Sequence, residues 1–119
     1  MNVMIKREAV VIELSEIFKV LGDTTRLRIL NLLSKQELCV YQIIQVLKLK
    51  EPNVSKHLNR MRYCGLISCN KISQWCYYSI DNDFVAQNIR LYEFLLCQWG
   101  NNEQYIDDLK RLDSFLLHS

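Results

Sequence analysis

The sequence contains little proline and glycine, with one Pro and three Gly among 119 residues. Both residue types interrupt helices and strands, so their scarcity favours a folded chain rich in regular structure over a flexible linker. No apolar run reaches the roughly 20 residues that cross a bilayer, and no secretion signal is visible. The chain is therefore expected to be cytoplasmic with no membrane partner, and its five cysteines are expected to be reduced thiols.

The motifs of common enzyme classes are also missing. There is no C-x-x-C pair for thiol exchange, no glycine-rich phosphate loop and no Ser/His/Asp cluster. The cysteine spacings match no common zinc finger. The adjacent carboxylates Asp107 and Asp108 are interpreted as part of a solvated helix face. The sequence therefore predicts a protein that is not an enzyme.

Acidic residues are absent from positions 52–80, although the whole chain carries 13 acidic and 15 basic residues. The stretch from 50 to 71 holds five basic residues against Glu51 alone: Lys50, Lys56, Arg60, Arg62 and Lys71. From residue 101 onward, acidic residues outnumber basic ones. A basic middle and an acidic tail favour a local contact with nucleic acid.

Apolar periodicity predicts a mainly α (α+β) chain that forms a single domain over residues 1–119. Helices are expected at 8–21, 24–34, 40–48, from 51 or 52 to 64, at 84–99 and at 103–117. Strands are expected at 66–70 and 75–80, joined as a hairpin around 71–74. The order α-α-α-α-β-β-α-α contains two short helices, a third helix and a two-stranded wing, which is the winged helix-turn-helix arrangement.

The fourth predicted helix has two chemically different faces. At about 100° per residue, Val54, Leu58 and Met61 share an apolar face. The polar face, its edges and the wing tip provide the candidate DNA contacts: Asn53, Ser55, Lys56, Asn59, Arg60, Arg62, Tyr63, Lys71 and Gln74. Cations suit phosphates, and Asn, Ser and Lys suit base edges in a major groove. The alternative is an ordinary solvated face, and His57 beside the apolar face is interpreted as structural or phosphate-contacting.

Several motifs together resemble the ArsR/SmtB family of metal-responsive bacterial repressors. The most specific are LGDTTRLRIL at 21–30 and VSKHL at 54–58, the latter followed by GLI at 65–67. ELCV at 37–40 and WCYY at 75–78 extend the resemblance to about residues 14–112.

The resemblance implies a homodimer joined through the first and the fifth helices. It implies a repressor that binds a palindromic double-stranded DNA operator and releases it when an inducer binds. Ser55, Lys56 and His57 would be among the DNA-facing residues. Lys50 and Glu51 depart from the family pattern, as does a wing tip without Gly-Arg.

The segment ELCVY at 37–41 resembles the ELCVC motif of arsenic sensors, with Tyr41 in place of the second cysteine. Soft thiolates suit As(III) or another thiophilic metal ion as the inducer, but one sulfur cannot chelate. Cys39, Cys64 and Cys97 are therefore separate candidate ligands.

Cys69 and Cys76 are predicted to face each other across the hairpin, on its buried face. They are interpreted either as a functional dithiol or as packed, free thiols.

Two alternatives to an inducible repressor stay open. One is a winged-helix regulator that has lost metal sensing, which the Tyr41 substitution favours. The other is a winged-helix module for protein–protein contact, which the acid-free stretch 52–80 disfavours.

Overall fold

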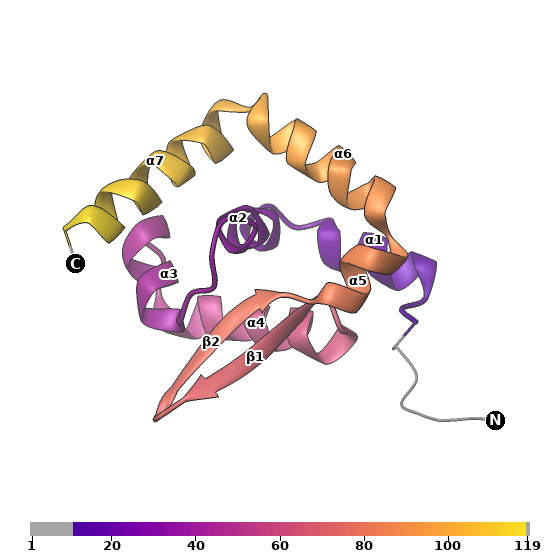
Figure 1. Cartoon of the computed structure of the whole chain (residues 1–119), viewed down its shortest axis with the longest axis horizontal. Helices are drawn as coiled ribbons and strands as arrows, with labels where there is room; N and C mark the ends of the chain where they lie inside the picture. Colours follow the sequence, from indigo (N-terminus) through magenta and orange to yellow (C-terminus); the bar gives the residue numbers. More distant parts are fainter. Residues whose placement is uncertain (1–10, 119) are drawn as a thin grey trace.

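The computed structural model describes residues 11–118, and that range contains seven helices and one antiparallel hairpin (Figure 1). The elements are α1 (Leu14–Leu21), α2 (Thr24–Leu33), α3 (Val40–Leu47), α4 (Glu51–Cys64), β1 (Ile67–Ile72), β2 (Trp75–Ile80), α5 (Asn82–Gln87), α6 (Ile89–Gly100) and α7 (Glu103–Leu117). The predicted fold class is confirmed, with α3, α4 and the hairpin as helix-turn-helix and wing. Within residues 11–118, no helix is long and apolar enough to cross a membrane.

Two predicted helices differ from the observed ones. Of the first, predicted over 8–21, residues 8–10 lie outside the described range and α1 starts only at Leu14. The continuous helix predicted over 84–99 is wrong, because α5 ends and α6 begins at Asn88. The Asn88 backbone N–H and its side-chain amide both donate to the Phe84 carbonyl at 3.0 Å. Such local side-chain bonds compete with continued helix.

Helix α2 lies at the centre of the fold, beneath an arch formed by α6 and α7 (Figure 1). It contacts α1, α4, β2 and α7, so its side chains are covered from several directions. Ile29, Leu30 and Leu32 are fully buried there and form the middle of the hydrophobic core. Both the helix-turn-helix and the C-terminal helix α7 therefore pack against α2.

A buried ion pair attaches α7 to α2. The Arg28 guanidinium donates to both carboxylate oxygens of Asp108, at 2.8 and 3.0 Å. The Asn31 side-chain amide also donates to the Tyr105 carbonyl at 3.0 Å. Asp108 is 0% exposed, so its interpretation as a solvated residue is wrong, whereas its neighbour Asp107 is exposed. Removal of either Arg28 or Asp108 would therefore leave a charged group without its partner between α2 and α7.

The hairpin register differs from the predicted one by two residues. Cys69 pairs with Tyr78 and Cys76 pairs with Lys71, so the two cysteines are diagonal neighbours on one face and not directly opposed. Their Cα atoms are 5.9 Å apart and the sulfurs form a disulfide. The expectation of five reduced thiols is thus wrong for this pair, and Cys39, Cys64 and Cys97 are the free cysteines.

Candidate nucleic-acid interface and cysteine sites

Helix α4 is fixed at both ends by local sequence. Pro52 occupies its first turn, where the missing N–H costs no hydrogen bond. Gly65 ends it in the left-handed conformation, at φ 95°. The predicted apolar face is confirmed, because Val54, Leu58 and Met61 are all fully buried. Burial of that face orients the opposite face of α4 toward solvent.

The outward face of α4 presents uncharged and positively charged groups. Asn53, Lys56, Asn59 and Arg62 are exposed, while Ser55 is half-buried. The Ser55 hydroxyl donates to the Glu51 carboxylate at 2.7 Å, which engages the one acidic group at the start of α4. Tyr63, at the end of this face, is 92% exposed and adds an aromatic ring. The helix thus offers hydrogen-bond donors and cations to a groove of nucleic acid.

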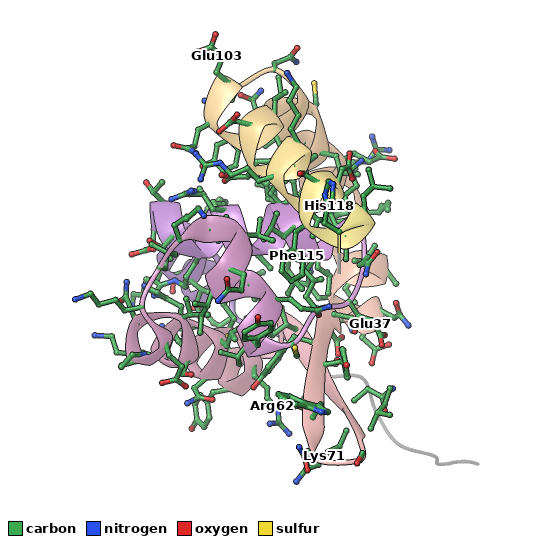
Figure 2. The ribbon with its side chains drawn as sticks, turned by 90° about the vertical axis from the view of Figure 1, so that its left-hand side faces the viewer. Glu37, Arg62, Lys71, Glu103, Phe115 and His118 are labelled. Carbon is green, nitrogen blue, oxygen red and sulfur yellow. A yellow bond between two sulfur atoms is a disulfide. The ribbon has the colours of Figure 1, made fainter. Side chains whose placement is uncertain are left out.

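The wing extends the basic surface beyond α4. Ser73 and Gln74 form the two-residue turn, where Ser73 adopts φ 58°. Lys71 and Gln74 are exposed beside it. Figure 2 shows Arg62 of α4 and Lys71 of the wing tip at the same end of the molecule. Both α4 and the wing tip can therefore contact the same nucleic-acid duplex.

Arg60 differs from the other candidate cations because it already has a partner. Its guanidinium lies 2.5 Å from the Glu16 carboxylate of α1. The ion pair joins α1 to α4 across the molecular surface and neutralises the charge that a phosphate would otherwise meet. Arg60 therefore connects α4 to α1 at the edge of the polar face.

His57 is buried under α4, which corrects the DNA-facing position implied by the resemblance. The Arg26 guanidinium lies 3.2 Å from His57 Nδ1. Because a guanidinium only donates hydrogen bonds, Nδ1 accepts and the ring proton sits on Nε2. That nitrogen lies 3.9 Å from the carboxylate of Asp23, which also caps α2 by accepting from the Arg26 N–H at 3.0 Å. His57 thus connects α4 to the start of α2.

Acidification is expected to destabilise the fold through His57. Burial is the main cause that lowers its pKa, opposed by Asp23 and assisted by the charges of Arg26 and Lys56. The unfolded chain, with a pKa of about 6.5, then binds the proton more readily than the folded one. The stabilisation is complete above about pH 6.5 and is lost as the pH falls through the folded-state pKa.

Urea unfolding at about pH 7.5 and about pH 5 measures this loss. The His57→Gln variant should lose less free energy of unfolding between the two conditions than the wild type. His118→Gln, at the exposed end of α7, is the matched control. An identical loss in wild type and His57→Gln would exclude His57 as the source.

The three free cysteines lie on different elements. Cys39 is buried at the N-cap of α3, where its N–H donates to the Gln42 side-chain oxygen at 3.0 Å. Cys64 ends α4, and burial raises the pKa of its thiol, which lowers the thiolate fraction. Cys97 is exposed on α6. The sequence named all three as candidates, and the ELCVC-like segment favours Cys39 among them.

A metal centre is not preformed within the described part of the chain. Residues 11–118 contain no group of three or more His, Cys, Asp or Glu side chains placed to hold an ion. The disulfide also removes Cys69 and Cys76 as thiolate ligands. The donor set of one chain therefore does not fit a chelated As(III) or another thiophilic ion.

Comparison with known proteins gives consistent matches. The model for the bacterial regulatory protein arsR family matches residues 23–68, which run from the cap of α2 into β1. An HTH-type transcriptional regulator from Methanocaldococcus jannaschii is 42% identical over 82 residues, covering 68% of this chain and 92% of that protein.

Two further relatives carry more informative names. An arsenic resistance transcriptional regulator from Pseudomonas putida is 37% identical over 65 residues, covering 54% of this chain and 51% of that protein, so the match spans about half of its length. The homodimeric winged helix-turn-helix DNA-binding domain of a possible ArsR-family regulator from Mycobacterium bovis has a TM-score of 0.61 and 26% identity. It is matched over 69% of this chain and 76% of that chain.

Proposed function

Because the chain belongs to the arsR family of bacterial regulatory proteins, which are transcriptional regulators and not enzymes, we propose that it binds one operator sequence through α4 and the wing. The outward polar face of α4 is the observation that carries this proposal. It combines Lys56 and Arg62 for phosphates with Asn53 and Asn59 for base edges. Lys71 and Gln74 at the wing tip would contact flanking backbone. In this role the protein acts in the cytoplasm, where its operator is.

The operator is proposed to be palindromic and the protein a homodimer. Large apolar side chains are exposed on α1 and α6, the elements that correspond to the predicted dimerisation helices: Leu14, Phe18, Ile89, Phe94 and Leu96. Exposed apolar patches of this kind mark interaction surfaces. A two-fold dimer places two copies of α4 about one helical turn of DNA apart. The single domain over residues 1–119 would then carry both functions.

The inducer is proposed to be a thiol-reactive compound that acts at Cys39. A relative is named for arsenic resistance, and Cys39 lies in the segment at 37–41 that resembles the ELCVC motif, at the start of the helix-turn-helix. Burial raises the pKa of the Cys64 thiol, and Cys97 is exposed on α6, away from the helix-turn-helix. The competing candidate is a repressor that has lost its inducer response, favoured by Tyr41 and by the absence of a preformed ligand cluster in residues 11–118.

A gel-shift titration against DNA upstream of the protein's own gene tests the operator proposal. Specific binding should resist competitor DNA of unrelated sequence, and Asn59→Ala should reduce this preference by about 1–3 kcal/mol. Gln87→Ala, an exposed amide at the end of α5, is the control for a lost amide. Unchanged specificity in Asn59→Ala would remove α4 as the reading element.

Adding arsenite or another thiol-reactive compound to the complex tests the inducer proposal. DNA should be released, and Cys39→Ser should blunt the release while Cys97→Ser should not. Release that persists in Cys39→Ser would assign the response to a different residue, and no release by any such compound would favour the repressor without an inducer.

A further inference from the structure

A hollow of about 210 Å³ lies where the helix-turn-helix, the wing and the C-terminal helix meet. Its walls come from the start of α3, from β2 and from the end of α7. The lining residues are Cys39, Tyr41, Gln42, Trp75, Tyr77 and Phe115. The residues proposed to contact the operator do not line this hollow.

Backbone pairing builds one side of the hollow. Leu38 forms an isolated bridge with Tyr78, with hydrogen bonds of 3.1 and 2.8 Å in the two directions. This bridge seats the segment before α3 against the outer edge of β2. Successive residues of extended chain point to opposite faces, so Leu38 and Tyr78 enter the core while Cys39 and Tyr77 share the other face.

Helix α7 closes the other side. Phe115 lies on its inner side, between α7 and the rest of the chain (Figure 2). The helix is fixed at this position by contacts with α2 and α3, including the buried pair of Arg28 and Asp108. The aromatic wall from α7 therefore has a rigid support.

The chemistry of the lining selects a ligand class. Four of the six lining residues are aromatic, Cys39 adds a sulfur, and none of the six is an acid, lysine, arginine or histidine. The remaining polar groups are the Gln42 amide and tyrosine hydroxyls, which form hydrogen bonds with neutral oxygen or nitrogen atoms. A charged ligand would find no counter-charge among these side chains.

We propose that this hollow binds a small, uncharged molecule with a single aromatic ring that carries a hydroxyl or carbonyl group. An apolar cavity of about 150 Å³ is large enough for benzene, so about 210 Å³ accommodates one ring and a small substituent. The inference rests on the proposed function, because it adds a ligand held without covalent reaction to the control of operator binding at the Cys39 site.

The position of the hollow connects ligand binding to DNA binding. Trp75 pairs with Ile72 across the turn, so it lies next to the wing tip with Lys71 and Gln74. Cys39 is the N-cap of α3, the helix that packs on α4. A ligand between them favours one orientation of the wing relative to α4. If that orientation differs from the DNA-bound one, the ligand weakens operator binding by its differential affinity.

The test uses benzyl alcohol as the probe and Trp75 as the reporter. The Trp99→Phe variant leaves Trp75 as the single tryptophan, and its fluorescence is followed during titration without DNA. A saturable change is expected, with a dissociation constant of about 1 mM or below for so small a ligand. Benzoate and benzylamine, its charged relatives, should produce at least a tenfold weaker response. Calorimetry on the wild type gives the same measurement without the tryptophan substitution.

Two lining variants and one control decide the site. Cys39→Phe, which fills the hollow, and Phe115→Ala, which removes a wall, should each weaken probe binding tenfold or more. Leu117→Ala, an exposed position two residues beyond Phe115, should not. Circular dichroism confirms that each variant is folded. A non-saturable response, equal binding of the charged probes, or binding unaffected by both lining variants would overturn the proposal.

A final arm separates this proposal from the proposed function. In the presence of saturating benzyl alcohol, the concentration of protein needed to shift the operator should rise, and Cys39→Phe should abolish that rise. Unchanged operator affinity would overturn the inducer role of the hollow. If the protein binds no operator at all, the proposed function fails, while the titration without DNA still decides whether the hollow is a ligand site.

Discussion

Replacing Asp108 with alanine is expected to lower the free energy of unfolding by about 3–5 kcal/mol, which is the cost of leaving one partner of a buried ion pair alone. The Arg28 guanidinium would lose both hydrogen bonds to the carboxylate, and Gln104 would lose its bond to the same group. A typical domain has about 5–15 kcal/mol in total, so the loss is large. Urea unfolding followed by circular dichroism measures it.

Asp107→Ala is the matched control for this prediction. Asp107 is exposed, and its ion pair with Arg111 is a surface contact one helical turn away. Surface pairs of this type contribute about 0.2–0.5 kcal/mol. Equal effects of the two substitutions would mean that Asp108 is as solvated as its neighbour and that α7 does not depend on this pair.

Phe94→Asp is expected to separate the homodimer and to weaken operator binding by about 10²–10⁴-fold. Phe94 is 57% exposed on α6, and Phe18 on α1 is equally exposed. A carboxylate in an apolar interface loses hydration without gaining a partner. A monomer binds one half-site and loses the gain from simultaneous engagement of two. Sedimentation measures the mass, and a gel-shift titration measures the affinity.

Leu117→Asp provides the control for a new surface charge. Leu117 is 82% exposed at the end of α7, on the side of the molecule opposite to α1 (Figure 1). Its replacement should leave both the mass and the operator affinity unchanged. A dimer that survives Phe94→Asp would show that α6 is not in the interface.

The sequence was a good guide to α4 because local signals agree there. Pro52 starts the helix, Gly65 stops it, and three apolar residues fix which face is buried. Those signals act within a few residues, so they do not depend on the rest of the fold. The outward direction of Lys56 and Asn59 follows from them directly.

The hairpin register was less predictable. Two-residue turns favour positive φ, for which Gly or Asn is the usual signal, and residues 71–74 contain neither. Ser73 adopts φ 58° instead. The turn lies one residue later than predicted, so each residue of β1 pairs with a residue of β2 two positions further along the chain than predicted. Leu38 additionally pairs with Tyr78 across 40 residues of sequence, a contact that no local pattern reveals.

The solvated position predicted for Asp108 and the DNA-facing position that the resemblance implied for His57 are wrong for a similar reason, whereas the interpretation of His57 as structural agrees with its burial. An acidic doublet on an amphipathic helix usually faces water, and the residue that buries Asp108 is Arg28, 80 positions away. His57 follows Lys56 in a motif associated with DNA, but its ring is turned under α4 by Arg26 and Asp23. Burial of polar groups depends on distant partners, which periodicity does not encode.

The salt dependence of operator binding by the wild type and Lys56→Ala tests the central claim, that the outward face of α4 contacts the operator. Between about 50 and 200 mM salt, the logarithm of the binding constant should fall linearly with the logarithm of salt concentration, and Lys56→Ala should reduce this slope by about 1 for each phosphate contact removed. Lys110→Ala, on α7, should keep the wild-type slope. Identical slopes and affinities for the wild type and Lys56→Ala would contradict the account.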